Sequence, residues 1–364
     1  MTSVERVAVI GTGLIGTSIA LASARAGASV TGWDSDGAVA TRAARIANFR
    51  AAGSLDEAIG GAEIVVVAPP IPTIASLVAT CLANSSDAVV TDVGSVKTAL
   101  IRQTLEAASA TDVPRFVPGH PMGGSERSGP DHASASVVDG IVWAITPHGT
   151  CDPAAVDLLE AWVTAVGARA VRLDPGRHDR LVAFVSHLPQ VASTALMSLA
   201  ATEEADEPEI MLLAAGGFRD LTRLAASNPV LWSEILLANR QAIAEAIDTY
   251  VDRLLRLRDG IVGERGDDVT ATFDEAKRAR LRLATKPTVR AGVAVLQIEV
   301  PDRPGALANL TAVLGGGSVN IEDLQIVHSP EGGRGTVHLT VALDEAARAT
   351  RVLDDVGLDP IRLA

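Results

Sequence analysis

The sequence predicts an α/β protein in three parts: a doubly wound sheet domain over residues 1–174, an all-α domain over 175–286 and a small βαββαβ domain over 292–364. Strand-like and helical segments alternate as far as residue 174, which is typical of a parallel sheet with helical crossovers. The strand pattern is then lost, and it returns after residue 292. A chain of 364 residues is also too long for one ordinary domain of about 100–200 residues.

The composition is that of a globular protein rather than a disordered or collagen-like one, with 48% hydrophobic and 21% charged residues. The net charge of −13 argues against nucleic acid or an anionic membrane as partner, because both bind basic patches. A local basic pocket for a small acid remains open.

Two cysteines, Cys81 and Cys151, are too few for a disulfide scaffold or a metal cluster, so no metal is expected. Reduced thiols predict a cytoplasmic protein. The strand-like run Arg6–Ile10 begins almost at the N-terminus, so we expect no signal peptide. We also expect no apolar run near the roughly 18 residues of a membrane helix.

The predicted strands of the first domain are apolar almost throughout, as expected when helices cover both faces of a parallel sheet. They are Val7–Ile10, Ser29–Trp33, Ile64–Ala68, Ala88–Val93, Arg115–Pro118, Ile141–Thr146 and Ala168–Leu173. The domain therefore reads as a doubly wound sheet.

In the second domain we predict helix from His178 to Ala200 and one long helix that begins at Pro229, directly after Asn228. The apolar stripe of the long helix is Leu231, Ile235, Ala238, Ala242, Ala246, Tyr250, Leu254 and Leu257. Such a stripe on an all-α domain predicts a homodimer or a higher homo-oligomer.

The third domain begins with a strand whose buried face alternates, continues with a helix that glycines terminate, and ends with strand, strand, helix and short strand. These segments are Ala294–Val300, Ala306–Leu314, Leu324–Ile326, Val337–Leu343, Glu345–Val356 and Ile361–Leu363.

A glycine-rich turn, Gly11-Thr12-Gly13-Leu14-Ile15-Gly16, joins the first strand to the first helix. Its glycines allow a tight turn, close approach of a pyrophosphate and close helix packing, as in Rossmann-like dinucleotide-binding domains. Asp34 ends the next strand, 23 positions after Gly11. A carboxylate there accepts hydrogen bonds from ribose hydroxyls and repels a 2′-phosphate, so NAD is favoured over NADP. Gly11, Gly13, Leu14, Ile15, Gly16 and Asp34 are the candidate cofactor residues.

His120 lies in a polar, glycine-rich segment just beyond a predicted strand, where ligands bind in open α/β sheets. A histidine there can take a proton from a hydroxyl during hydride transfer. Ser95, after the preceding strand, is positioned to hydrogen-bond His120 and orient it.

Arg223 stands among apolar helical residues, where an unpaired charge is costly. It is either a bidentate anchor for a substrate carboxylate or the partner of Asp220 in an ordinary salt bridge. The sequence leaves both interpretations open.

Together these segments resemble the prephenate/arogenate dehydrogenases of tyrosine biosynthesis. The matching motifs are GTGLIGTS (11–18), DVGSVK (92–97), GHPMGGSERSG (119–129), SHLPQ (186–190) and GGFRDLTRLA (216–225). The resemblance covers residues 5–265, in the same order. DRPGALANL (302–310) and VNI (319–321) resemble an ACT domain, a module that often binds amino acids.

The resemblance implies roles for individual residues. His120 matches the histidine that draws the proton from the substrate's ring hydroxyl, and Ser95 the serine that supports it. Arg223 matches the arginine that holds a substrate carboxylate. Further candidate substrate residues are Ser125, Glu126, His187 and Gln190. Gln190 departs from the family, whose SHLPH-type segment has a second histidine here.

The implied reaction is the NAD-dependent oxidative decarboxylation of prephenate to 4-hydroxyphenylpyruvate. Arogenate, which differs only in its side chain, is the alternative substrate and would give tyrosine. The ACT resemblance implies feedback regulation by tyrosine, with Asp302, Pro304, Gly305, Asn320 and Ile321 as candidate effector residues. A module that serves only to build a dimer is the alternative.

Two further alternatives belong to other classes. A non-catalytic sensor of NAD and an amino acid would not need His120, Ser95 and Arg223 together. A β-hydroxyacid dehydrogenase would rely on a lysine in the helical region, and none occurs between Ala168 and Ala276.

Overall fold

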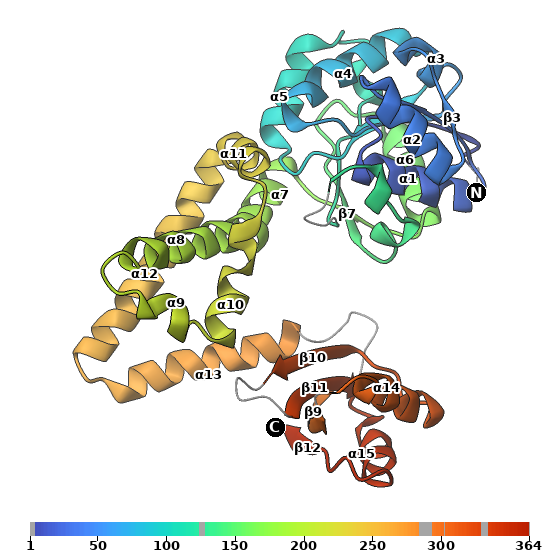
Figure 1. Ribbon diagram of the computed structural model, residues 1–364. Helices are drawn as coiled ribbons and strands as arrows, with labels where there is room; N and C mark the ends of the chain where they lie inside the picture. Colours follow the sequence, from blue (N-terminus) through green and yellow to red (C-terminus); the bar gives the residue numbers. More distant parts are fainter. Residues whose placement is uncertain (1–3, 124–127, 284–292, 302, 329–333, 364) are drawn as a thin grey trace. The chain divides into compact units, whose positions relative to one another are not determined.

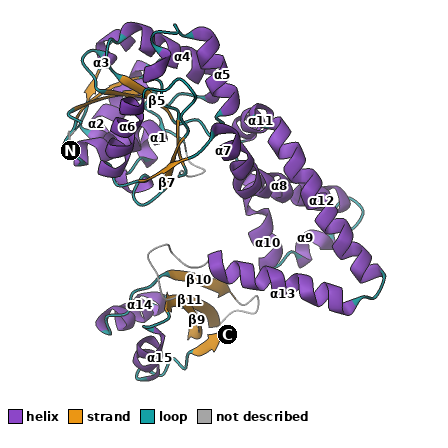
Figure 2. Cartoon of the chain, turned by 180° about the vertical axis from the view of Figure 1, so that it is seen from behind, coloured by secondary structure: helices purple, strands orange, loops and turns teal. Residues whose placement is uncertain are grey.

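The computed structural model describes residues 4–123, 128–283, 293–301, 303–328 and 334–363 (Figure 1). The chain divides into two compact units. The first unit is Met1–Ala195 with Leu224–Thr249, and the second is Leu196–Arg223 with Tyr250–Ala364. Strands occur toward both ends of the chain and helices alone between them (Figure 2). The domain boundaries predicted at 174 and 286 stay predictions, because this division follows contacts and not domain ends.

The first unit contains a parallel sheet in the order β3-β2-β1-β4-β5, as the doubly wound prediction requires. Its strands are β1 (Arg6–Ile10), β2 (Ser29–Trp33), β3 (Arg50–Ala51), β4 (Ile64–Val67) and β5 (Val89–Asp92). β1 pairs with β2 on one side and with β4 on the other, so the strand order reverses there. Ligands bind such sheets at the carboxyl ends of the strands beside that reversal.

Helices cover both faces of this sheet, and alternate residues of β1 show it. Val7 and Val9 belong to the core that α1 and α6 complete, whereas Ala8 and Ile10 belong to the core of α3, α4 and α5. The helices are α1 (Leu14–Arg25), α2 (Gly37–Ala47), α3 (Leu55–Ile59), α4 (Ile71–Asn84), α5 (Thr98–Ala107) and α6 (Pro153–Ala165).

A second, three-stranded sheet has the order β6-β7-β8, with β6 (Gly119–Pro121) antiparallel to β7 (Val142–Ile145) and β8 (Arg169–Arg172) parallel to β7. The strand predicted over Arg115–Pro118 is wrong. A 3₁₀ turn, η1 (Val113–Arg115), occupies its start, and only Phe116 bridges to β5. Prolines 114 and 118 lack the N–H that a strand ladder needs, so regular pairing begins later, at β6. Two more 3₁₀ turns follow, η2 (Pro130–His132) and η3 (Ala135–Val137).

The helix predicted from His178 to Ala200 is interrupted. α7 (Pro175–Val182) and α8 (Leu188–Glu203) are joined by a π-helical turn, η4 (Ala183–His187). Pro189 has no N–H to donate one helical turn back, and a π turn relieves such a position. The turn sets the direction of His187.

The stretch Pro175–Glu203 spans 29 residues and contains an 18-residue window with a mean hydropathy of 1.3, which is long and apolar enough by length and composition to cross a membrane. The expectation that no apolar run approaches this length is therefore wrong. The stretch also carries Asp179 and Gln190, which are buried and hydrogen-bonded within the first unit, and 33% of its apolar window is buried.

The predicted long helix is also broken, at Asn239. α11 (Pro229–Ala238) begins as expected, because Asn228 accepts hydrogen bonds from the N–H groups of Val230 and Leu231. α12 (Arg240–Val262) follows, and the buried Asn239 between them bonds to α7 and η4. An apolar stripe cannot reveal such a break, because the spacing of three and four continues across it.

The second unit contains α9 (Glu209–Leu213), α10 (Gly216–Thr222), α13 (Gly266–Leu283) and the C-terminal module; the 3₁₀ turn η5 (Arg223–Ala226) begins at its border. The module follows the expected βαββαβ order and forms an antiparallel sheet, β10-β11-β9-β12. Its elements are β9 (Val293–Pro301), α14 (Ala306–Gly316), β10 (Asp323–His328), β11 (Arg334–Ala342), α15 (Ala346–Asp354) and β12 (Ile361–Leu363).

Candidate active site

The turn between β1 and α1 fits a dinucleotide. Gly11 has φ +91°, and a Cβ there would lie 2.6 Å from the carbonyl carbon of Ala68. At Gly16 a Cβ would lie 2.0 Å from the Gly11 oxygen, so only glycine lets α1 pack this close. A Cβ on Gly13 would meet nothing within 4 Å, which leaves open space above the turn for a pyrophosphate.

Two cavities meet at this turn. One, of about 540 Å³, is lined by Trp33, Asp34 and Ser35 at the end of β2. The other, of about 450 Å³, is lined by Ser95 and His120. Both are also lined by Gly13, Ala68, Pro69 and Pro70. The pair therefore offers adjoining space for the two halves of a dinucleotide, with His120 at the second half.

Asp34 is held in place by the turn. Its Oδ2 accepts hydrogen bonds from the Thr12 N–H (2.7 Å) and hydroxyl (3.2 Å), and its Oδ1 accepts from the Asp36 N–H (3.0 Å). The fixed carboxylate lines the first cavity, where it can accept ribose hydroxyls and repel a 2′-phosphate. Among the described residues, no cluster of histidine, cysteine and carboxylate side chains could hold a metal ion.

His120 lies inside β6, opposite Ala144 of β7, and not beyond a strand end as predicted. The prediction that Ser95 hydrogen-bonds and orients it is also wrong. Within the described part of the chain the Ser95 hydroxyl is buried without a hydrogen-bond partner, and Ser95 lines the second cavity.

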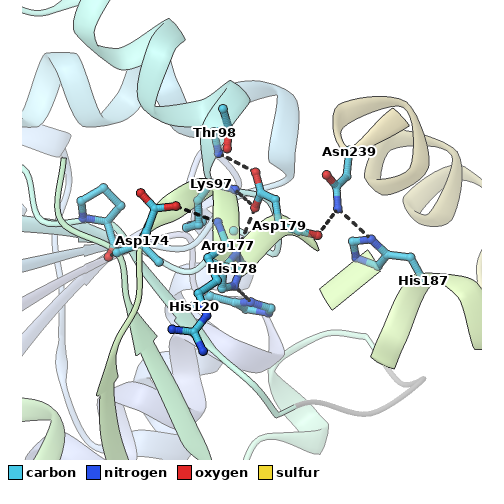
Figure 3. A network of polar contacts seen from close by, with 12 residues as sticks. Lys97, Thr98, His120, Asp174, Arg177, His178, Asp179, His187 and Asn239 are labelled. Carbon is cyan, nitrogen blue, oxygen red and sulfur yellow. Dashed lines mark hydrogen bonds and ion pairs between the residues drawn. The ribbon is translucent and has the colours of Figure 1, made fainter. Parts of the chain in front are cut away.

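The partner of His120 is instead His178 of α7. The distance from His120 Nδ1 to His178 Nε2 is 2.9 Å, and His178 Nδ1 lies 2.9 Å from Asp179 Oδ1 (Figure 3). The two imidazole rings meet edge to face, with their centroids 5.1 Å apart. His178 and Asp179 are both buried.

Asp179 also binds the start of α5. Its Oδ1 accepts from the backbone N–H of Lys97 and its Oδ2 from that of Thr98, each at 2.8 Å. Burial by itself would raise the pKa of Asp179, but the hydrogen bonds from His178 and Thr98 outweigh it and leave the pKa below the ordinary value. Asp179 is therefore an anion at neutral pH.

The Lys97 side chain is wholly buried and ties β5 to β6. Its ammonium donates to the Asp92 carboxylate and, at 2.6 Å, to the carbonyl of Gly119, the residue before His120. Burial lowers the pKa of Lys97, and Asp92 opposes that effect.

Burial lowers the pKa of His120 well below 6.5, and the positive charge of Lys97 lowers it further. One edge of the ring remains open to the cavity. His120 is thus a neutral imidazole at neutral pH, able to accept a proton.

His187 lies deeper than the cavity wall. Burial lowers the pKa of His187 to about 4, so it is neutral. Its Nδ1 accepts from the Asn239 amide (3.2 Å), which also donates to the carbonyl of Asp179 (2.9 Å). Trp232 packs edge-on against the ring. His187 therefore braces α7 and α11 in this structure.

Gln190 is also buried, and its amide is already engaged. It donates to the Leu224 carbonyl (2.7 Å) and to the Thr194 hydroxyl (3.4 Å), and its oxygen accepts from Ser227 (3.3 Å). Gln190 thus fastens α8 to η5.

The structure does not test the remaining predicted substrate residues. Ser125 and Glu126 lie outside the described residues. Arg223 is exposed and belongs to the second unit, so its distance from His120 is not fixed.

Among the candidate effector residues, Asp302 lies outside the described part of the chain. Gly305 has φ +88° at the start of α14, after the exposed Pro304. Asn320 binds Glu322 and Glu345 within the module, and Ile321 packs against its core.

Sequence reasoning missed His178, Asp179 and Asn239. A buried carboxylate needs a partner, but Asp179 lies in the polar run from Arg177 to Arg180, which gives no sign of burial. The adjacent pair His178-Asp179 was the available signal, although its partners lie on distant segments.

Two family models match the chain. Residues 19–172 match the nucleotide-binding domain of prephenate dehydrogenase, and residues 174–275 match its dimerization domain. Among curated proteins, the chain is 29% identical to a prephenate dehydrogenase of Bacillus subtilis, over 94% of this chain and 93% of the relative. It is 32% identical to a cyclohexadienyl dehydrogenase of Zymomonas mobilis, over 80% of this chain and all of the relative.

Solved structures of prephenate and arogenate dehydrogenases are also similar to this chain. A prephenate dehydrogenase from Aquifex aeolicus, in complex with hydroxyphenyl propionate and NAD⁺, matches with a TM-score of 0.72 and 27% identity, over 78% of this chain and 99% of that one. Arogenate dehydrogenase from Synechocystis matches with a TM-score of 0.67 and 28% identity, over 76% and 98%.

Proposed function

Because the chain belongs to the prephenate dehydrogenase family, we propose that it converts prephenate and NAD⁺ to 4-hydroxyphenylpyruvate, CO₂ and NADH. The observation that carries this proposal is the neutral His120 beside an unpartnered Ser95 hydroxyl, in the cavity that begins at the dinucleotide turn.

The dinucleotide turn holds the cofactor. The N–H groups at the start of α1 would bind the pyrophosphate, and the Asp34 carboxylate would accept hydrogen bonds from the ribose hydroxyls, which favours NAD over NADP. NAD⁺ supplies the hydride acceptor. Leu14 and Ile15 line the His120 cavity, where they exclude water from the nicotinamide side.

His120 accepts the proton of the 4-hydroxyl of prephenate as hydride leaves C4 of the ring. The C4 oxygen becomes a carbonyl as the hydride leaves. When the ring carboxylate then leaves as CO₂, the electron pair of that bond completes the aromatic ring and turns the carbonyl into a phenolate. The phenolate takes a proton back from His120 and becomes the 4-hydroxyl of the product. Aromatisation makes the reaction strongly downhill, so the protein has mainly to align C4 and hold the base. Ser95 offers a hydroxyl to the substrate oxygen or to the carboxamide of the nicotinamide.

We assign the substrate's side-chain carboxylate to Arg223, with Ser125 and Glu126 at the entrance of the site. His187 and Gln190 act on the substrate through the helices that they brace, as their buried hydrogen bonds indicate. Arogenate is the second candidate substrate, supported by the similarity to the Synechocystis arogenate dehydrogenase.

The test is NADH formation with prephenate and with arogenate, side by side. We expect the higher kcat/KM with prephenate. His120→Asn is expected to lower kcat at least about a hundredfold, because a lost general base costs about that much or more. His132→Asn, at an exposed histidine, is the control and should leave kcat unchanged. A wild-type protein that binds NAD and oxidises neither substrate would instead be a sensor.

We further propose that the enzyme is a cytoplasmic homodimer and that the C-terminal module is an ACT domain that binds tyrosine. The match to a dimerization domain over residues 174–275 supports the dimer. Both cysteines are free, which suits a reducing compartment. The βαββαβ order and the left-handed Gly305 turn before α14 support the effector site.

A further inference from the structure

We propose that His178 and Asp179 are positioning residues that keep His120 in one tautomer, with the proton on Nδ1, which contacts His178, and the lone pair on Nε2, which is left to accept the substrate's proton. The proposal deepens the function above and depends on His120 being the base. The donor and the acceptor of each hydrogen bond can be assigned in turn, starting from Asp179, which can only accept.

Asp179 fixes the first bond. As an anion it is only an acceptor, and both of its oxygens already receive backbone N–H groups from the start of α5. His178 Nδ1, 2.9 Å from Oδ1, must therefore carry a proton and donate it.

The second bond follows from the first. In its neutral form His178 has this one N–H, so its Nε2 is left with a lone pair. The only hydrogen bond possible over the 2.9 Å to His120 Nδ1 is then one that His120 donates. His120 Nδ1 is thus protonated, and its Nε2 has the free lone pair.

No other described side chain hydrogen-bonds His120, and the Ser95 hydroxyl does not. Lys97 holds the backbone before His120 but does not hydrogen-bond its ring. His178 therefore determines how the ring is turned, and the Asp179 anion stabilises the imidazolium that forms when Nε2 accepts the substrate's proton.

Two substitutions at His178 test whether it orients His120. His178→Phe keeps a ring in place but removes the acceptor for His120 Nδ1. His178→Gln keeps one, because an amide oxygen can occupy the position of Nε2. We expect His178→Phe to lower kcat at least about a hundredfold, with KM values for NAD and prephenate within about threefold of the wild type. His178→Gln should recover kcat to within about tenfold.

His148→Gln is the matched control, because His148 is a half-buried histidine bonded to the Phe116 carbonyl and lies outside both cavities. Its kcat should equal that of the wild type. Equal losses of kcat in His178→Phe and His178→Gln would overturn the proposal.

A measurement without substrate tests the tautomer directly. In wild-type protein labelled with ¹⁵N-histidine, we expect NMR at neutral pH to show His120 protonated at Nδ1 and unprotonated at Nε2. In His178→Phe both nitrogens should give averaged shifts. A wild-type His120 protonated at Nε2, as a doubly protonated His178 would impose, overturns the proposal even if the variants fail to fold.

Different results would contradict the proposed function and the positioning role of His178. If the wild type oxidises neither prephenate nor arogenate while the Nδ1–H tautomer is present, the proposed function is wrong and the positioning role stands. If the wild type is active with His120 in the other tautomer, only the positioning role is wrong.

Discussion

His120 is the residue on which proton transfer depends, and its surroundings set the pH range in which it works. Burial and the Lys97 charge both act against its protonated form. A group with a lowered pKa stays neutral down to more acid pH than a free histidine, and it loses its base function only as the pH falls through that lowered value.

We therefore expect the acidic limb of kcat/KM for prephenate to lie below pH 6.5, the ordinary value for histidine. Between pH 7 and pH 8 the rate should be flat with respect to this group. The measurement is a pH profile at saturating NAD, with stability checked at each pH. An acidic limb at pH 6.5 or above would show that His120 is exposed to solvent in the active enzyme.

Arg223 makes a second prediction at this scale. Arg223→Ala should raise KM for prephenate about 10- to 100-fold with little change in kcat, because a charge-assisted hydrogen bond contributes about 1.5–3 kcal/mol. Arg258→Ala, an exposed arginine of the same unit, should leave KM unchanged. An unchanged KM in Arg223→Ala would return this residue to a structural role.

The sequence could identify His120 because it lies in a segment rich in glycine and polar residues, but it could not identify the group that orients it. Ser95 follows the preceding predicted strand, which made it the natural candidate, and it does line the same cavity. His178 is 58 residues from His120 and reaches it only because α7 packs against this part of the fold. Such a contact depends on tertiary packing, for which one sequence has no local signal.

At the scale of elements, two glycines of the β1–α1 turn have different expected roles: Gly13 in NAD binding and Gly16 in the stability of the fold. Gly13→Ala should raise KM for NAD about tenfold or more at unchanged stability, because its methyl group enters only the open space above the turn. Gly16→Ala should lower the free energy of unfolding by about 3 kcal/mol or more, because its methyl group meets the Gly11 carbonyl.

Urea denaturation and NAD titration of both variants measure the difference. Gly149→Ala serves as the control, since a Cβ there meets nothing within 4 Å. Equal destabilisation at Gly13 and Gly16 would contradict the assignment of the open space to the cofactor.

Most strands of the first sheet could be predicted because buried parallel strands are continuously apolar. The interruptions of the predicted helices could not be predicted. The π turn after α7 and the break at Asn239 preserve the helical spacing of apolar residues on both sides. What distinguishes them is a side chain bonded to another helix, such as Asn239 to α7.

For the whole molecule, the C-terminal module has its own core. The buried residues of that core, which include Leu296, Leu310, Leu339 and Leu353, all come from the module itself among those described. We expect a chain that ends at Lys286 to keep kcat with prephenate within about threefold and to lose inhibition by tyrosine. Tyrosine titrations of both chains in the NADH assay measure this. Equal inhibition would locate tyrosine at the active site.

The sequence predicted three domains from composition and periodicity, whereas contacts divide the described chain into two units whose borders cross α8 and α12. Periodicity reports which face of an element is buried. It does not report which neighbour buries it, so such borders lie beyond what one sequence reveals.

Gln190 bears on how this protein could have diverged from relatives with histidine at that position. The glutamine amide serves two acceptors and one donor at once. A neutral histidine, with one N–H and one lone pair on opposite edges of a rigid ring, cannot repeat all three. Exchange between the two residues is therefore expected to need compensating changes at Thr194 or Ser227.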